Sequence, residues 1–331
     1  MRVLFFGTPE FAVPSLEILS AHHAVLAAVT QPDQPSGRGR QPHASAIKLF
    51  ARSHGMPIFE PGDPSEPYFL QTVSQLRPEL AAVAAYGRLL PKALLQRFPH
   101  GAINLHASLL PRYRGAAPIS WAIIRGERKT GVTIFQIDEM LDHGPVLLQK
   151  EHPIRPEDTS LTLMDSLSHL GAQLLSEAVK LIEKGQAQPQ PQEETQVTFA
   201  PSLKKEDGII DWKLDCQEIH NRVRGLQPWP GATTWILQIT KANSPDPPRQ
   251  LPEGQLLKLF GTHPEFGRYG ALSTPGTIVV ADPTQGLWVQ TGRGQLRLDR
   301  LQKEGGKPLD AGAFLRGNPI PSGTLLGSLV E

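Results

Sequence analysis

The chain has 331 residues, of which 39% are hydrophobic and 20% are charged. These proportions are typical of a globular protein, and the length suits two domains better than one. With 33 basic and 32 acidic residues the net charge is +1, which excludes nucleic-acid binding by bulk charge alone, so such a partner would have to meet a local basic patch.

The single cysteine and the N-terminal sequence indicate in which compartment the protein works and which metal sites it lacks. The single cysteine, Cys216, excludes an intramolecular disulfide and a cysteine-rich zinc site, and it fits a reducing compartment. The opening run "MRVLFFGTPEF" is typical of a first strand rather than a signal peptide. No stretch approaches the roughly 18 apolar residues of a membrane span. We therefore expect a cytoplasmic protein that uses no metal and has no membrane partner.

The first half of the chain alternates between strand-like and helix-like segments. Short apolar runs predict buried strands, and amphipathic runs between them predict helices. The predicted strands cover 2–6, 24–30, 79–87, 101–107 and 130–138, and the predicted helices cover 8–21, with Thr8 as its N-cap, and 46–55. This rhythm indicates an α/β fold with a doubly wound, mostly parallel Rossmann-like sheet. Ligands bind such sheets beyond the carboxyl ends of the strands.

Residues 31–45, between the second strand and the second helix, are rich in proline, glycine and arginine and are predicted to form a loop. The Gly-Arg-Gly-Arg run in this loop contains Arg38 and Arg40. Arginines can bind phosphates through paired hydrogen bonds, and glycines let the backbone approach a ligand closely. A loop that is merely solvated is the simpler interpretation. The turn "FFGTPEFA" lacks the GxGxxG spacing, so a dinucleotide site is not expected.

The stretch "INLHASLLPRYRG", residues 103–115, places polar chemistry at the end of the fourth predicted strand. Asn104 and His106 are two residues apart, so their side chains share one face of that strand. A carboxamide beside an imidazole can stabilise an oxygen that gains negative charge during acyl transfer. The run "DEMLDHG" offers Asp142 to orient the imidazole or to move a proton. Ordinary roles as a polar strand end and a turn residue are the alternative.

A long helix and a polar segment separate the two halves. Leucines that repeat every three or four positions predict a helix over residues 158–185. The proline-punctuated polar segment that follows predicts an interdomain linker at 189–203. We therefore expect a catalytic domain at 1–188 and a smaller second domain at 204–331.

The second domain is predicted to be a small OB-like β-barrel. A helix at 215–226 begins with Asp215 and Glu218, spaced as in a capping box. Turn residues separate the strand-like runs, which lie at 232–240, 276–282, 286–291 and 295–302. Trp229, between two prolines, is interpreted as a residue of the barrel core. The stretch 241–275 has no firm pattern.

The motifs of the chain resemble those of the folate-dependent formyltransferases, and within them most of all the enzymes that act on methionyl-tRNA. The resemblance covers nearly the whole chain. It rests on the runs "FFGTPEFA", "TQPDQPSGRGR", "AAYGRLLPK", "NLHASLLPRYRGAAPI", "TGVTIFQIDEMLDHG", "IDWKLDCQEIHNRVRGLQPWPGA" and "LQKEGGKPLDAGAFLRG". It implies transfer of the formyl group of 10-formyltetrahydrofolate to the α-amino group of methionine on initiator methionyl-tRNA, by a monomer that needs neither a metal nor a nucleophilic side chain.

The resemblance also implies roles for particular residues. Asn104, His106 and Asp142 match the catalytic trio of the family. The folate-binding walls match Ser108, Leu109, Leu110 and Pro111, together with Ala85, Tyr86, Gly87, Arg88, Leu89 and Leu90. Arg38 and Arg40 match the loop that reaches the tRNA acceptor end. Lys204, Lys205, Arg222 and Arg224 could extend this basic track in the second domain, although a solvated surface charge is the simpler interpretation of each one alone.

Three alternative functions stay open at this point. The first is a formyltransferase for a small amine, such as an amino sugar nucleotide or glycinamide ribonucleotide, although the Gly-Arg-Gly loop and the second domain argue against it. The second is an enzyme that passes the formyl group to water, which formate release would reveal. The third is an RNA-binding module without catalysis, which would have no need of the trio.

Overall fold

The computed structural model describes residues 1–36, 41–239, 251–267 and 273–329. Within it the chain forms two compact units. The first comprises Met1–Pro118, Lys129–Ile154 and Thr162–Pro201, and the second comprises Ile119–Arg128, Arg155–Leu161 and Ser202–Glu331. Most of the predicted linker, up to Pro201, is therefore counted with the first unit, and the second unit includes two short pieces from the first half of the chain.

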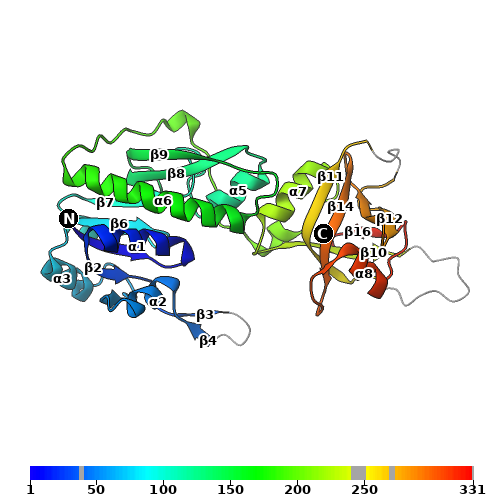
Figure 1. Ribbon diagram of the computed structural model, residues 1–331, viewed down its shortest axis with the longest axis horizontal. Helices are drawn as coiled ribbons and strands as arrows, with labels where there is room; N and C mark the ends of the chain where they lie inside the picture. The colour runs from blue at the N-terminus through cyan, green and yellow to red at the C-terminus, as the bar shows by residue number, and fades with distance from the viewer. Residues whose placement is uncertain (37–40, 240–250, 268–272, 330–331) are drawn as a thin grey trace, which may run out of the picture. The chain divides into compact units, whose positions relative to one another are not determined.

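A seven-stranded sheet with the order β5-β2-β1-β6-β7-β8-β9 forms the centre of the first unit (Figure 1). The strands are β1 (Arg2–Gly7), β2 (Ala24–Val29), β5 (Ile58–Phe59), β6 (Leu80–Ala84), β7 (Ala102–His106), β8 (Lys129–Gln136) and β9 (Val146–Pro153). The first five are parallel, β8 is antiparallel to β7, and β9 is antiparallel to β8. The prediction of a doubly wound, mostly parallel sheet is confirmed.

Helices cover both faces of this sheet because its strands are apolar on both sides. The helices are α1 (Val13–His22), α2 (Ala46–Ser53), α3 (Pro67–Leu76), α4 (Lys92–Leu95) and α6 (Ser160–Glu183). Phe6 packs in one buried cluster with Val73 of α3 and Leu94 of α4. On the opposite face α6 approaches β7 so closely that a Cβ on Gly171 would lie 2.6 Å from the Leu105 side chain. Figure 1 shows α6 lying along the sheet.

Two local predictions in the first unit need correction. The first helix does not begin at Thr8, because Pro9 is extended, residues Glu10–Ala12 form a short 3-10 turn and α1 starts at Val13. The Thr8 hydroxyl instead donates to the carbonyl of Tyr86. The loop predicted at 31–45 contains two short antiparallel strands, β3 (Gln34–Ser36) and β4 (Gln41–His43).

The second unit contains an antiparallel sheet that curls into a barrel, as predicted. Its strands run in the order β12-β13-β14-β11-β10-β16, and a bridge between Thr277 and Leu325 joins the two ends of this order. The strands are β10 (Ala232–Gln238), β11 (Leu256–Glu265), β12 (Ile278–Asp282), β13 (Gly286–Gln290), β14 (Gln295–Lys303), β15 (Leu309–Asp310) and β16 (Leu325–Gly327). The stretch without a sequence pattern thus contains β11.

Helices complete the second unit. They are α5 (Pro118–Ile124), α7 (Cys216–Gly225) and α8 (Ala311–Gly317). The predicted capping box is confirmed, since Asp215 accepts from the Glu218 amide and Glu218 accepts from the Asp215 amide. Cys216 is buried in the barrel core, and this burial raises the pKa of its thiol.

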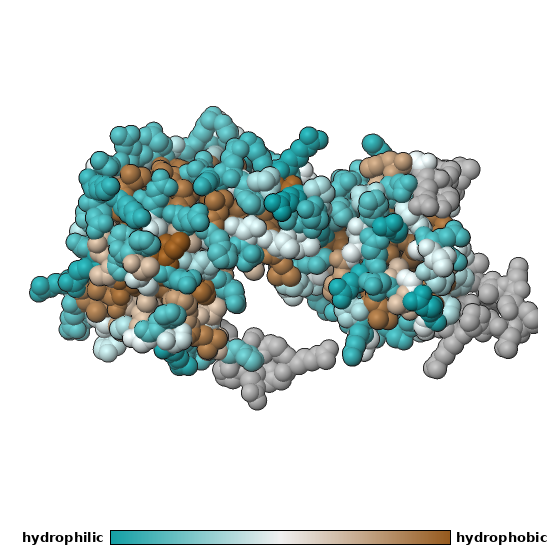
Figure 2. Space-filling view, in the orientation of Figure 1, coloured by the Kyte–Doolittle hydropathy of each residue, from teal (hydrophilic) through white to brown (hydrophobic). Residues whose placement is uncertain are grey.

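The surface is mainly polar. On the face shown in Figure 2 hydrophilic residues predominate, and the hydrophobic ones are broken into separate patches. Trp229 is 58% exposed, so its interpretation as a barrel-core residue is wrong. None of the helices in the described parts of the chain is long and apolar enough to cross a membrane.

Candidate functional site

His106, the last residue of β7, is buried at the carboxyl end of the parallel strands and held by one strong contact. Its Nε2 lies 2.9 Å from the backbone carbonyl of Tyr113. A carbonyl can only accept, so Nε2 carries the hydrogen and donates it. The other nitrogen, Nδ1, faces the carboxylate of Asp142 at 3.7 Å. Nδ1 is therefore the ring atom that remains for proton transfer.

Asp142 lies beside His106 although the antiparallel strand β8 ends at the opposite end of β7. Because β8 is antiparallel to β7, Gln136 at the end of β8 pairs with Ile103 near the start of β7, whereas His106 pairs with Thr133. The loop after β8 thus begins about three residues, or roughly 10 Å, from the level of His106. It must run back along the sheet to place Asp142 beside the imidazole.

Several local features hold this returning loop. Asp142 has a left-handed backbone with φ +49°, a conformation that costs about 1–3 kcal/mol for a residue other than glycine. Its carboxylate accepts from the amide of Gly115 at 2.8 Å. Gly144 lies against the carbonyl of Gln136, where any Cβ would overlap the oxygen. His143 is half-buried, and its Nδ1 lies 2.6 Å from a carboxylate oxygen of Asp138.

Sequence reasoning missed the residues that support this loop from the segment after α6. Gln192 contacts the carbonyls of Asp142 and Gly144, and the buried Arg114 binds Gln192 and Glu194. The hydrogen bond from Arg114 lowers the pKa of the Glu194 carboxyl. Glutamine in a polar, proline-rich stretch is typical of a linker, so no local signal pointed to these contacts.

Asn104 lies on the same face of β7 as His106, as predicted. It is half-buried, and none of the described residues is a hydrogen-bond partner of its carboxamide. A donor with no internal partner at the carboxyl end of a parallel strand is available to a ligand.

The turn predicted to line the folate site, Ser108 to Pro111, is built tightly onto β8 and β9. Thr133 donates to the carbonyl of Ser108 and accepts from the amide of Leu110. Gln149 donates to the carbonyl of Leu110 at 2.6 Å. The Leu110–Pro111 peptide is cis. Leu110 is buried, whereas Leu109 and Pro111 are half-buried, so the latter two offer more surface to a ligand.

The second predicted wall, Ala85 to Leu90, follows β6 and is divided between core and surface. Tyr86 is 1% exposed and Leu90 is 8% exposed, and both pack in the core with Phe6. Burial raises the pKa of the Tyr86 hydroxyl. Ala85, Gly87 and Leu89 are exposed and Arg88 is half-buried, so the surface that the segment presents comes from these four residues and not from the tyrosine ring.

The predicted tRNA contacts differ in their surroundings. Arg38 and Arg40 lie outside the described residues. In the second unit Lys204 and Lys205 are exposed, and Arg222 is half-buried. Arg224 is 9% exposed, and its guanidinium donates to Asn221 and to the carbonyls of Arg155 and Asp158. The guanidinium therefore binds groups inside the second unit, and we no longer propose Arg224 as a tRNA contact.

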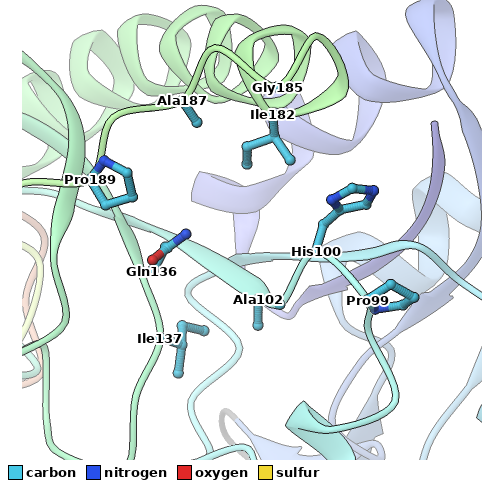
Figure 3. Close-up of a pocket in the computed structure, with 10 residues that line it drawn as sticks. Pro99, His100, Ala102, Gln136, Ile137, Ile182, Gly185, Ala187 and Pro189 are labelled. Atoms are coloured by element: carbon cyan, nitrogen blue, oxygen red, sulfur yellow. The ribbon is translucent and has the colours of Figure 1, made fainter.

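A cavity of about 470 Å³ lies elsewhere in the first unit (Figure 3). It is lined by Ala102 at the start of β7, Gln136 at the end of β8, and Ile182 of α6. This is the end of β7 opposite to His106, so the cavity is separate from the predicted chemistry. Among the residues that the structure describes, no group of three or more His, Cys, Asp or Glu side chains is placed to hold a metal ion.

Comparison with known proteins gives matches to both units. Residues 1–179 match the Formyl transferase family, and residues 202–319 match the family described as Formyl transferase, C-terminal domain. The methionyl-tRNA formyltransferase of Syntrophus aciditrophicus is 45% identical, covering 99% of this chain and 99% of its own length. That of Trichlorobacter lovleyi is 43% identical, covering 98% and 96%.

Solved structures share the fold at lower identity. HypX from Aquifex aeolicus in complex with tetrahydrofolic acid has a TM-score of 0.60 at 19% identity, over 95% of this chain and 47% of HypX. An N-formyltransferase from Helicobacter canadensis with folinic acid and dTDP-3-aminofucose has a TM-score of 0.61 at 18% identity, over 92% and 99%.

Proposed function

This chain belongs to the methionyl-tRNA formyltransferase family, and on that premise we propose that it formylates the methionyl group of initiator methionyl-tRNA. The formyl group comes from 10-formyltetrahydrofolate. The observation that carries the proposal is the pair formed by His106 Nδ1 and the Asp142 carboxylate, 3.7 Å apart, together with the Asn104 carboxamide on the same strand face, which has no hydrogen-bond partner among the described residues.

The carboxamide and the imidazole have distinct tasks in this reaction. The α-amino group of methionine attacks the formyl carbon, the new C–N bond forms, and the bond to the folate nitrogen breaks. Negative charge collects on the formyl oxygen during the attack, and the Asn104 NH2 group is the donor that stabilises it. The Nε2 hydrogen of His106 is engaged by Tyr113, so the imidazole acts through Nδ1.

The proton of the attacking amine leaves through the His106–Asp142 pair. The gap of 3.7 Å between Nδ1 and the carboxylate exceeds a direct hydrogen bond, and Asp142 is only partly buried, with 13% of its side chain exposed. The pair can therefore take up a proton at Nδ1 and pass it on to the folate nitrogen as that nitrogen leaves.

We assign the folate to the exposed apolar side chains of the segments that follow β6 and β8. Leu89 is 73% exposed and Met140 is 56% exposed, and an ion pair at 2.7 Å between Lys92, the first residue of α4, and Glu139 connects the two segments. Exposed apolar side chains with polar groups around them fit a flat ligand with polar edges. Arg38 and Arg40, with Lys204 and Lys205, provide the positive charge for the tRNA backbone. We propose that the enzyme acts as a monomer in the cytoplasm.

A direct assay tests the function. Incubation with charged initiator tRNA and 10-formyltetrahydrofolate should yield formylmethionine in the mass spectrum of the released aminoacyl group. An amino sugar nucleotide, glycinamide ribonucleotide and water serve as competing acceptors. Faster transfer to one of these than to methionyl-tRNA would contradict the proposal.

The His106→Ala variant tests the mechanism in the same assay. Loss of the imidazole should lower kcat by about 10²–10³ or more, because the group that takes up the proton of the attacking amine is removed. Binding of tRNA, measured by filter retention, should change little. His169→Ala, an exposed histidine on α6, is the control and should keep full activity. Undiminished turnover by His106→Ala would rule out this mechanism.

A further inference from the structure

The segment that sequence reasoning took for a linker is fixed along the first unit beside the catalytic pair. Gln190 pairs with Val146 through two backbone hydrogen bonds of 2.7 and 2.8 Å. Phe199 pairs in parallel with Arg114. Residues 190–200 therefore lie along the first unit as a strap, which is interrupted by a 3-10 turn at Glu194–Gln196 and is bonded to the first unit at both ends.

Both members of the catalytic pair are connected to this strap, His106 through Tyr113 and Asp142 directly. Tyr113, whose carbonyl accepts from His106, donates its own amide hydrogen to the Thr198 hydroxyl at 2.9 Å. Asp142 is bonded through its carbonyl to Gln192 at 2.9 Å. The relative position of the imidazole and the carboxylate thus depends on a segment that contains neither of them.

Gln192 is the residue in the strap with the most specific set of contacts. Its Oε1 accepts from Nε and Nη2 of Arg114 at 3.1 and 2.8 Å. Its Nε2 donates to the carbonyls of Asp142 and Gly144, each at 2.9 Å. Arg114 is 5% exposed and is held on its other side by Glu194 at 2.7 Å. Every polar atom of the Gln192 amide is therefore used.

The hydrogen bonds of Gln192 fix the part of the loop after β8 that carries Asp142. The loop returns along the sheet, and Asp142 adopts a left-handed backbone in it. The two carbonyls that Gln192 binds belong to Asp142 and Gly144, the residues before and after His143, so the amide holds the loop at the residue that carries the carboxylate. An amide with one acceptor and two donor hydrogens fits an arginine on one side and two carbonyls on the other, whereas a carboxylate or an apolar side chain does not.

We propose that Gln192 is a positioning residue that holds Asp142 in register with His106. The inference rests on the proposed catalytic role of Asp142. Misplacing a reacting group by about 1 Å can lower a rate about 10²-fold, so loss of Gln192 should reduce kcat without removing any group that touches a substrate.

The test measures kcat and KM of single Gln192 variants in the full chain and then of a double variant with Asp142→Asn. Gln192→Ala should lower kcat about 10²-fold, leave the KM for 10-formyltetrahydrofolate within about twofold, and change the thermal midpoint little. Gln192→Glu keeps the acceptor for Arg114 but loses both donors, so it should be as slow as the alanine variant. Gln190→Ala, two residues away with an exposed side chain, should be as active as the parent.

The double variant separates positioning from general support of the fold. If Gln192 acts through Asp142, then Gln192→Ala should add no further loss to Asp142→Asn. Full activity of the Gln192 variants, or losses that multiply in the double variant, would overturn the inference while Asp142→Asn stays impaired. Full activity of Asp142→Asn would instead remove the catalytic assignment and, with it, this inference. If Gln192→Ala does not fold, the isosteric Gln192→Glu decides.

Discussion

At the scale of single residues, hydrogen-bond accounting distinguishes the members of the catalytic trio. His106 has its Nε2 hydrogen committed to Tyr113, and Asp142 has its carboxylate committed to Gly115. Asn104 has no described partner for its carboxamide. The first two are held in place by the fold, and the third keeps its donors for the ligand. This difference predicts different consequences for substitutions at the three positions.

Asn104→Ala should lower kcat by about 10²–10³ with little change in stability, because it removes a donor to the developing charge and breaks no internal contact. Asn104→Asp should be at least as slow, since it places a negative charge where negative charge develops. Steady-state kinetics with methionyl-tRNA, together with thermal melting, measure both effects. A large fall in the thermal midpoint of Asn104→Ala would show that the carboxamide has a structural partner.

At the scale of elements, the packing of α7 against β11 contains a titratable group. His220 of α7 is half-buried, and its Nδ1 lies 3.0 Å from the Thr262 hydroxyl of β11. Burial, together with the nearby charge of Arg224, lowers the pKa of this imidazole. In the unfolded chain the value returns to roughly 6.5. Unfolding therefore takes up a proton below that pH, and stability is lost as the pH falls from about 6.5 towards the lower folded value.

His220→Gln should flatten this pH dependence. One histidine can contribute at most about 1.4 kcal/mol per pH unit to the slope of the unfolding free energy. All five tryptophans, at positions 121, 212, 229, 235 and 288, lie in the second unit, so tryptophan fluorescence during urea unfolding reports that unit. The comparison is made at pH 7.5 and 5.5.

The comparison variant for this experiment is His263→Gln, an exposed histidine on β11 whose charge helps to lower the His220 pKa. It should reduce the difference between the two pH values less than His220→Gln does, because the burial of His220 is the larger cause. His23 in the first unit also has a pKa lowered by burial. Its effect on stability does not enter this measurement, because tryptophan fluorescence reports only the unfolding of the second unit. An unchanged slope in His220→Gln would mean that α7 packing does not depend on the neutral imidazole.

At the scale of the whole molecule, the nearly balanced net charge limits how the protein can bind the negatively charged tRNA. A net charge of +1 gives no long-range attraction, so tRNA must be met by local groups. Lys204 and Lys205 are exposed, Arg222 is half-buried and Arg224 is buried, so the described candidates in the second unit are the two lysines and Arg222. The arginines of the Gly-Arg-Gly run then become the principal basic residues proposed for the first unit.

Arg38→Ala should weaken the use of tRNA more than the use of folate. A charge-assisted hydrogen bond contributes about 1.5–3 kcal/mol, so kcat/KM for methionyl-tRNA should fall about 10–100-fold. The KM for 10-formyltetrahydrofolate should stay within about twofold. Arg52→Ala, an exposed arginine on α2, controls for loss of a positive charge. Equal effects of Arg38→Ala on both substrates would count against a tRNA contact.

The sequence by itself determined the two-domain organisation, most of the strands and the pairing of Asn104 with His106, because these follow from local apolar runs and the two-residue period of a strand. It missed β11 and the exposure of Trp229, where proline-rich segments carry no regular pattern. Only the tertiary structure decided that Asp142 returns beside His106, that Tyr86 and Arg224 are buried, and that Gln192 supports the catalytic loop. Those facts depend on an antiparallel strand and on contacts between residues far apart in the sequence, from 27 positions for Gly115 and Asp142 to 69 for Arg224 and Arg155, which no local propensity encodes.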